Sequence, residues 1–145
     1  MIALDTNLLV YAHRRDARDH EAARDAVVRL AESGDRWAIP WPCLGEFYSV
    51  ATGARHYDPP SLPNEAIDQV DIWLESPNLT VLGENASTWS VLRTLLADAK
   101  TTGPRVHDAR IAAICLSHGV KELWTAERDY GRFPALRVRN PLVAG

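Results

Sequence analysis

The chain has 145 residues, of which 46% are hydrophobic and 24% are charged, and its formal net charge is −3. This length suits one domain over residues 1–145, because a domain of that size buries roughly two-thirds of its unfolded surface and needs no cross-links to fold. The composition is that of an ordinary globular protein, and no stretch of it is typical of a disordered chain. No window approaches the ~20 apolar residues of a membrane span, and no basic, apolar leader precedes the first predicted strand, so we expect a cytoplasmic protein.

The balance of charges is not that of a strongly basic nucleic-acid-binding protein. The chain carries 16 basic and 19 acidic residues, and five of the acids are candidate site residues discussed below. With those five set aside, 14 acids remain against the 16 basic residues. That remainder neither excludes nor predicts binding to RNA. The two cysteines, Cys43 and Cys115, lie among apolar residues without a second ligand nearby, which predicts buried thiols.

The chain opens with a short apolar run over residues 1–4, typical of a parallel strand that is covered on both faces. A helix over residues 8–12 follows, with Asn7 as its expected cap. A longer amphipathic helix is predicted over residues 18–33, and Gly34 stands where a C-terminal cap belongs. The N-terminal segment is therefore a strand followed by two helices.

The rest of the chain continues this alternation of strands and helices. Pro42 suits the first turn of a helix that we predict through about residue 55, and the proline content of residues 58–63 predicts a loop. Further helices are expected over residues 64–74, 86–97 and 106–118, and further strands over residues 37–39, 79–82, 123–125 and 136–138. Such alternation predicts one α/β domain with a parallel sheet flanked by helices, whose functional site lies at the carboxyl ends of the strands.

Three acidic residues fall at positions that such a sheet would bring together. Asp5 ends the first strand, and the alternative, with about equal support, is that it serves only to cap the next helix. Glu46 lies three residues after Cys43 and four before Val50, on the apolar stripe of its helix, where a carboxylate is unusual unless it is paired or binds a metal. The alternative is a Glu at the edge of the stripe that reaches water. Asp108 opens a largely apolar helix, and a helix start also favours an acid for purely structural reasons.

Two further acids, Glu127 and Asp129, follow the strand that ends at Thr125, in a turn where both could be ordinary surface residues. Several carboxylates close together raise one another's pKa values unless a cation neutralises them. Oxygen ligands in an incomplete shell suit Mg²⁺ or Mn²⁺, which keep waters and bind substrate phosphate. The combined pattern predicts metal-assisted hydrolysis of a phosphodiester.

Four segments of the sequence resemble one known family over nearly the whole chain. They are LDTN at residues 4–7, the lone Glu46, HDARIAA at 107–113 and WTAERDYGRF at 124–133, in the family's order and spacing. On these segments the chain resembles the PIN domains, and within them the VapC-like toxins of bacterial toxin-antitoxin pairs.

The resemblance implies a three-layer α/β/α fold and an Mg²⁺- or Mn²⁺-dependent endoribonuclease that cuts RNA. It also implies a homodimer and a small cognate VapB-like antitoxin whose tail blocks the acidic crevice. Asp5, Glu46 and Asp108 match the family's metal-binding acids. Three more residues match positions that orient the site through hydrogen bonds: Thr6, Asn7 and Thr125.

The last segment departs from the family pattern. The family more often has Asp where this chain has Glu127, and Asp129 matches a second common acid, so either residue is a candidate to complete the catalytic acids. The longer Glu127 could act through water while Asp129 bonds backbone in the loop. Tyr130 stands where Phe is usual, and we expect this to change packing only. The alternative function is a PIN-fold module that holds RNA or a partner without cleaving it.

Overall fold

The computed structural model describes residues 1–143. A sheet of five parallel strands forms its centre, in the order β3-β2-β1-β4-β5. The strands are β1 (Ile2–Leu4), β2 (Trp37–Pro40), β3 (Leu79–Leu82), β4 (Glu122–Trp124) and β5 (Val138–Arg139). The α-helices are α1 (Thr6–His13), α2 (His20–Glu32), α3 (Trp41–Ala51), α4 (Pro63–Leu74), α5 (Ala86–Ala99) and α6 (Val106–Ser117). Two short 3₁₀ turns are η1 (Gly103–Arg105) and η2 (Asp129–Arg132).

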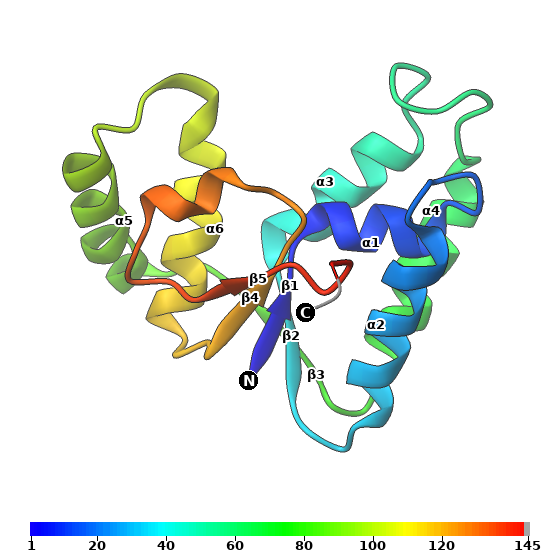
Figure 1. Ribbon diagram of the computed structural model, residues 1–145, viewed down its shortest axis with the longest axis horizontal. Coiled ribbons are helices and arrows are strands. Elements are labelled where there is room, and N and C mark those ends of the chain that lie inside the picture. Colours follow the sequence, from blue (N-terminus) through cyan, green and yellow to red (C-terminus); the bar gives the residue numbers. More distant parts are fainter. Residues whose placement is uncertain (144–145) are drawn as a thin grey trace.

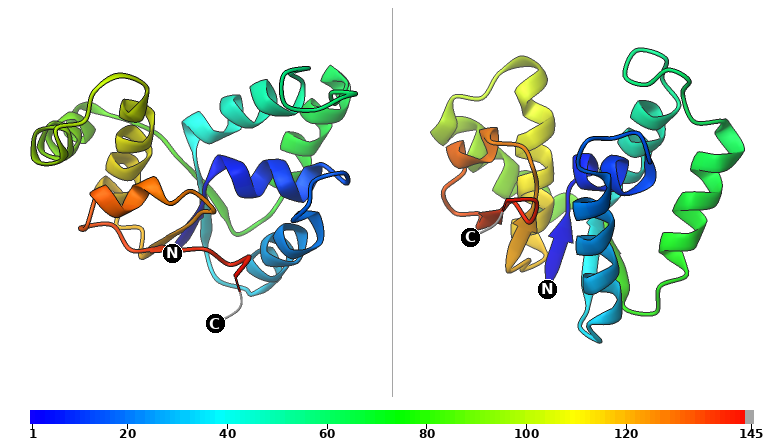
Figure 2. Two further views of the ribbon diagram at one scale, coloured as in Figure 1. Left: turned by 45° about the horizontal axis from the view of Figure 1, so that its top comes forward. Right: turned by 45° about the vertical axis from the view of Figure 1, so that its right-hand side comes forward.

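The helices form two groups, one on each side of the sheet. Helices α5 and α6 lie together on one side, whereas α1, α2 and α4 lie on the other, and α3 runs from the upper end of β2 toward α4 (Figure 1). The views of Figure 2 show the same two groups with the strands between them. The predicted α/β/α architecture with four to five short strands is therefore confirmed, and no helix in residues 1–143 is long and apolar enough to cross a membrane.

The strand order places a natural site at the middle of the sheet. From the central strand β1 the chain builds outward through β2 and β3, and it returns to β1's other side to add β4 and β5. The order of strands therefore reverses at the β1–β4 pair, where Leu4 lies beside Trp124. In open α/β sheets, ligands bind outside the carboxyl ends of strands at such a reversal. The next residues along these two strands are Asp5 and Thr125.

The core is packed on both faces of the sheet, as the apolar strands require. Helix α6 buries nearly all of its body, from Ala109 through Cys115, and this confirms it as a central helix. Both cysteines are buried and free, as predicted. Gly34 and Gly119 follow α2 and α6 with φ values of +82° and +67°, a conformation that residues with a side chain rarely adopt.

The structure corrects several helix boundaries. Helix α1 begins at Thr6, and its N-cap is Asp5, so the expectation of Asn7 as the cap was wrong. The Asp5 carboxylate accepts the first free backbone N–H and starts the helix earlier than the apolar pattern indicates. Helix α3 ends at Ala51 rather than near residue 55, and the backbone N–H and hydroxyl of the next residue, Thr52, both donate to the Tyr48 carbonyl. The turns η1 and η2 have no counterpart in the sequence-based prediction.

Candidate active site

Asp5 is a buried carboxylate held in a fixed orientation. Its side chain is 6% exposed. One oxygen, Oδ1, accepts a hydrogen bond from the Thr6 backbone N–H at 2.8 Å, and the other, Oδ2, accepts one from the Thr125 hydroxyl at 2.8 Å. The Cys43 thiol lies 3.8 Å from Oδ1. Asp5 is thus both the cap of α1 and a residue of the site, so the two sequence-based interpretations are not alternatives.

Burial makes ionisation of the Asp5 carboxyl unfavourable. It raises the pKa of the Asp5 carboxyl from 3.8 to about 6, against the hydrogen bonds from Thr125 and Thr6, which lower it. The negative charges of Glu46 and Asp108 raise the pKa of Asp5 further. A carboxylate that is both desolvated and surrounded by like charge is a characteristic arrangement at functional sites.

A hydrogen-bond network ties the start of the chain to the end of β4. The Thr125 hydroxyl donates to Asp5 and accepts from the Glu127 backbone N–H at 2.9 Å and from the Asn7 amide at 3.4 Å. Asn7 in turn accepts from the Ala126 backbone N–H at 3.2 Å. The carboxyl ends of β1 and β4 are therefore locked together by the polar side chains that the resemblance singles out.

Glu46 lies at the edge of α3 rather than on its buried stripe. Cys43 and Phe47 are fully buried, but Glu46 is exposed, so its expected place on the apolar stripe was wrong. The buried face of α3 is narrower than the spacing of its apolar residues indicates, and Glu46 lies just outside that buried face. Its carboxylate nevertheless points back to the site, because Oε2 accepts a hydrogen bond from the Thr6 hydroxyl at 2.9 Å.

Asp108 lies in the first turn of α6 and is half-buried. Burial raises the pKa of its carboxyl, as do the charges of Glu127, Asp129 and Glu46, against the opposing charge of Arg132. Within residues 1–143, no hydrogen bond stabilises the Asp108 carboxylate. An acid in the first turn also suits the start of a helix, and the Asp108 side chain in addition lines the same cleft as Asp5.

The two acids after β4 differ in position. Glu127 lines the same cleft as Asp5 and Asp108, and its Oε1 accepts from the Asp129 backbone N–H at 3.1 Å. Asp129 begins η2, is exposed and does not line the cleft, although its charge acts on Asp108. The carboxylate that bonds the loop backbone is therefore that of Glu127, and not that of Asp129.

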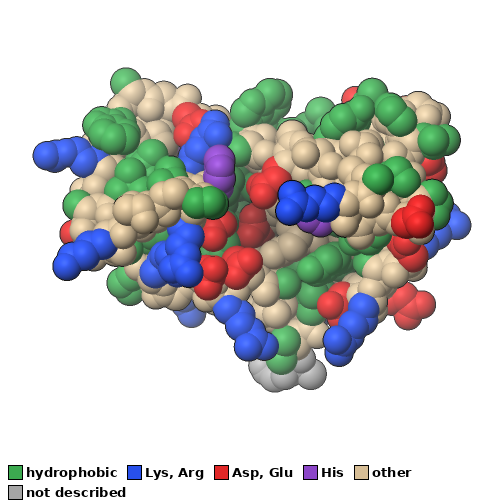
Figure 3. Space-filling model, turned by 90° about the horizontal axis from the view of Figure 1, so that it is seen from above, with side chains coloured by type: hydrophobic (Ala, Val, Ile, Leu, Met, Phe, Trp, Pro, Cys, Tyr) green, Lys and Arg blue, Asp and Glu red, His purple; other side chains and the backbone are tan. Residues whose placement is uncertain are grey.

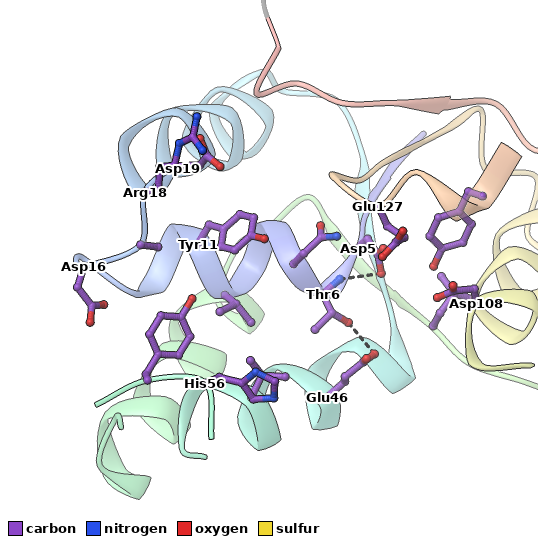
Figure 4. Close-up of a pocket in the computed structure, with 17 residues that line it drawn as sticks. Asp5, Thr6, Tyr11, Asp16, Arg18, Asp19, Glu46, His56, Asp108 and Glu127 are labelled. Carbon is purple, nitrogen blue, oxygen red and sulfur yellow. Dashed lines mark hydrogen bonds between the residues drawn. The ribbon is translucent and has the colours of Figure 1, made fainter. Parts of the chain in front are cut away.

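Four of these five acids meet in one cleft of about 620 Å³. Figure 3 shows acidic side chains gathered in a hollow at the middle of this face, with Lys and Arg side chains around it. In Figure 4, Asp5, Glu127 and Asp108 lie at one end of the cleft, and Glu46 points toward Thr6 from α3. These four acids come from separate places in the chain: Asp5 after β1, Glu46 on α3, Asp108 on α6 and Glu127 after β4. Two further acids, Asp16 and Asp19, line the same cleft.

The cleft has the donor chemistry for a hard cation, although its carboxylates are not yet gathered around one point. Within residues 1–143, no group of three or more His, Cys, Asp or Glu side chains is already arranged to hold a metal ion. The donors are all carboxylates, which suit hard cations such as Mg²⁺ or Mn²⁺, and these ions complete their shell with waters and substrate oxygens. A closed site of the structural zinc type does not fit these residues.

Several lining residues were not predicted from the sequence. Tyr11, Arg18 and Asp19 lie on the side of the cleft away from Asp108 (Figure 4), and His56 and Tyr57 also line the cleft. The guanidinium of Arg14 lies over the Tyr57 ring, 4.5 Å from its centre. Their sequence positions carry no motif, so only the fold identifies them.

Tyr130 also lines the cleft, and within residues 1–143 its hydroxyl is buried without a hydrogen-bond partner. Whether Tyr in place of Phe changes packing only stays a prediction.

Fold and site together define a small α/β protein with a carboxylate-lined cleft at the reversal point of a parallel sheet. The profile of the PIN domain matches residues 2–136. The chain therefore belongs to the PIN domain family.

Characterised relatives cover nearly its full length. The chain is 35% identical to VapC ribonuclease Mb2897 of Mycobacterium bovis over 142 residues, which are 98% of this chain and 96% of that protein. It is 31% identical to ribonuclease VapC31 of Mycobacterium tuberculosis over 143 residues, which are 98% of this chain and 100% of that protein. These relatives are ribonucleases by name.

Solved structures with the same fold include toxin-antitoxin complexes. VapBC2 of Rickettsia felis, bound to a DNA fragment from its promoter, aligns with a TM-score of 0.68 and 23% identity over 97% of this chain and 98% of the matched one. VapC20 of Mycobacterium tuberculosis, a toxin that cleaves the sarcin-ricin loop, aligns with a TM-score of 0.68 and 15% identity over 90% of this chain and 93% of the other. These likenesses establish the fold.

Proposed function

We propose that this protein is a divalent-cation-dependent endoribonuclease, the toxin of a VapBC-type toxin-antitoxin pair. The observation that carries the proposal is the set of four carboxylates that reach one cleft from separate elements, two of them with raised pKa values. Unneutralised carboxylates would repel the RNA backbone, so this arrangement is favourable only with a cation between protein and phosphate. The ribonuclease names of relatives at 35% and 31% identity support the substrate class.

Three acids of the cleft would bind the cation, and two threonines would orient them. Asp5, Glu46 and Asp108 would hold Mg²⁺ or Mn²⁺, which supplies an activated water and neutralises charge on the phosphodiester. Thr125 and the Thr6 backbone fix both oxygens of Asp5, so the orientation of that carboxylate is set before substrate arrives. The Thr6 hydroxyl does the same for Glu46.

Glu127 is the candidate to complete the catalytic acids. It lines the cleft, whereas Asp129 does not. Its second carboxylate oxygen remains available while Oε1 holds the loop. We infer that Glu127 contributes directly to the acidic cleft and that Asp129 contributes only charge from outside it.

Two partners belong to the same proposal. Solved structures of the same fold include VapBC complexes, which supports a VapB-like antitoxin as the cognate inhibitor of this chain. A homodimer remains a prediction. Trp41 and Trp89 are 60% and 59% exposed, and large apolar side chains on a surface favour burial against a second protein.

The test is a cleavage assay on total RNA with purified, antitoxin-free protein, with and without Mg²⁺ or Mn²⁺, and with Asp108→Asn as the matched inactive variant. Discrete fragments that need both the cation and Asp108 would support the nuclease. RNA that is bound but left uncut under every cation would favour the binding module instead.

A further inference from the structure

Tyr130 places a hydrogen-bond donor inside the acidic cleft. The residue lies in η2, its side chain is 1% exposed, and its ring packs edge-on against Phe133 with the ring centres 6.4 Å apart. It lines the cleft together with Asp5 and Asp108. Within the part of the chain that the structure describes, its hydroxyl has no hydrogen-bond partner.

An unpartnered buried hydroxyl lowers stability, because the group loses its hydrogen bonds to water and gains none in return. Phenylalanine at this position would fill the same space without that loss. A polar group that costs stability in the empty protein requires an explanation, and one explanation is an acceptor that arrives only when the cleft is occupied.

The surroundings of Tyr130 favour Asp108 as the acceptor. Both oxygens of Asp5 already accept hydrogen bonds, from Thr6 and Thr125. The Asp108 carboxylate lines the same cleft, at the same end as Asp5 in Figure 4, and accepts no hydrogen bond within residues 1–143. Beside Asp5, the cleft therefore has a buried hydroxyl that lacks an acceptor, and the Asp108 carboxylate lacks a donor.

A tyrosine hydroxyl is protonated at neutral pH, so the Tyr130 hydroxyl can donate a hydrogen bond. A hydroxyl that donates to a carboxylate forms a short, charge-assisted bond.

We propose that Tyr130 is a positioning residue that donates a hydrogen bond to the Asp108 carboxylate when the cleft holds its cation. A cation draws the mutually repelling acids of the cleft together, and the Tyr130 hydroxyl then holds Asp108 in the drawn-in position. This inference rests on the proposed function, since it requires a cation in the cleft. It assigns to Tyr130 a role that a phenylalanine could not fill.

The test compares wild-type protein with Tyr130→Phe, and uses Tyr48→Phe as the matched control, because Tyr48 lies on α3 and does not line the cleft. Isothermal titration with MnCl₂ alone, without RNA, measures the affinity for the cation. We expect Tyr130→Phe to bind Mn²⁺ roughly tenfold more weakly, as loss of a hydrogen bond to a charged group implies. The control should bind as the wild type does.

Thermal unfolding in EDTA separates positioning from a structural role. Without the cation, Tyr130→Phe should unfold at a temperature roughly 2–6 °C higher than the wild type, since it removes an unpartnered buried group. A lower unfolding temperature would show that the hydroxyl has a structural partner and would overturn the proposal. So would an unchanged affinity for Mn²⁺.

A crystal structure with Mn²⁺ supplies the direct readout, with the Tyr130 hydroxyl oxygen expected about 2.5–2.7 Å from an Asp108 carboxylate oxygen. If the wild type binds Mn²⁺ and cleaves RNA while Tyr130→Phe is indistinguishable from it, only the role of Tyr130 fails. If the wild type binds no cation, the proposed function fails and this inference falls with it.

Discussion

Replacing Asp5 by Asn should inactivate the protein and, in the absence of metal, stabilise it. Burial raises the pKa of Asp5 from 3.8 to about 6. A rise of about two units means that ionised Asp5 costs the folded state ~3 kcal/mol at neutral pH. Asn removes the charge but keeps an oxygen that can accept from the Thr6 N–H. Allowing for an imperfect contact with Thr125, we expect a gain of ~1–3 kcal/mol in the free energy of unfolding at pH 8.

The difference in stability between Asp5→Asn and the wild type depends on pH. The pKa of Asp5 is higher in the folded than in the unfolded state. The stability that protonated Asp5 contributes is therefore complete below about pH 4 and is lost as pH rises through about 6. Wild type and Asp5→Asn should be equally stable near pH 4, and the variant should become the more stable protein between about pH 4 and 6.

Urea titrations in EDTA at pH 4, 6 and 8 measure this difference, and the RNA assay with Mg²⁺ measures the loss of cleavage. Adding Mn²⁺ should stabilise the wild type and leave Asp5→Asn unchanged, because only the wild type has the full set of carboxylates. If the variant were less stable than the wild type at pH 8, the ionised form of Asp5 would be structural, and the argument from desolvation would be refuted.

The remaining predictions concern the other residues of the cleft. Thr125→Val should cost ~1–3 kcal/mol in urea titrations and lower cleavage, because it leaves Asp5 and the Glu127 N–H without their partner. Glu46→Gln should change the unfolding free energy by less than about 0.5 kcal/mol, since Glu46 is exposed, yet should strongly reduce cleavage in the RNA assay. Glu127→Ala should lose more activity than Asp129→Ala in that assay. EDTA should abolish cleavage without changing the helical circular dichroism signal, and excess Mg²⁺ should restore it.

Each of these has a specific contrary result. Unchanged stability of Thr125→Val would mean that the hydrogen bonds of Thr125 to Asp5 and to the Glu127 N–H are weaker than their geometry indicates. The matched control is Thr52→Val, which removes a hydroxyl from the end of α3, outside the cleft. Full activity of Glu46→Gln would remove Glu46 from the set of metal-binding acids. A larger loss for Asp129→Ala than for Glu127→Ala would reverse our choice between them. Cleavage that persists in EDTA would contradict the role of a cation.

Asp5 and Asp108 are predictable from the sequence because local patterns fix their positions. A short apolar strand puts Asp5 at its carboxyl end, and an almost wholly apolar helix must be central, so Asp108 at its start meets the strand ends. The reversal of strand order then brings both to one edge of the sheet. These are consequences of periodicity and of parallel-sheet geometry alone.

Glu46 and the missed residues depend on packing instead. Helical spacing places Glu46 near the apolar stripe, but the width of the buried face is set by neighbouring helices. The bond between Thr6 and Glu46 joins residues 40 apart, and no local pattern encodes it. Tyr11 on α1 and Tyr57 in the loop after α3 line the cleft only because the fold packs these two segments beside it. The unpartnered hydroxyl of Tyr130 is likewise a property of the assembled cleft.

The reversal of the sheet at β1 also orders events during synthesis. Thr125, which orients Asp5, is synthesised 120 residues after it. Asp108 and Glu127 also follow Asp5 by more than 100 residues. A nascent chain that has not yet reached β4 has neither the neighbouring strand nor the complete set of acids. For a nuclease, this arrangement delays activity until the ribosome has synthesised the chain past β4, so the shorter nascent fragments are inactive.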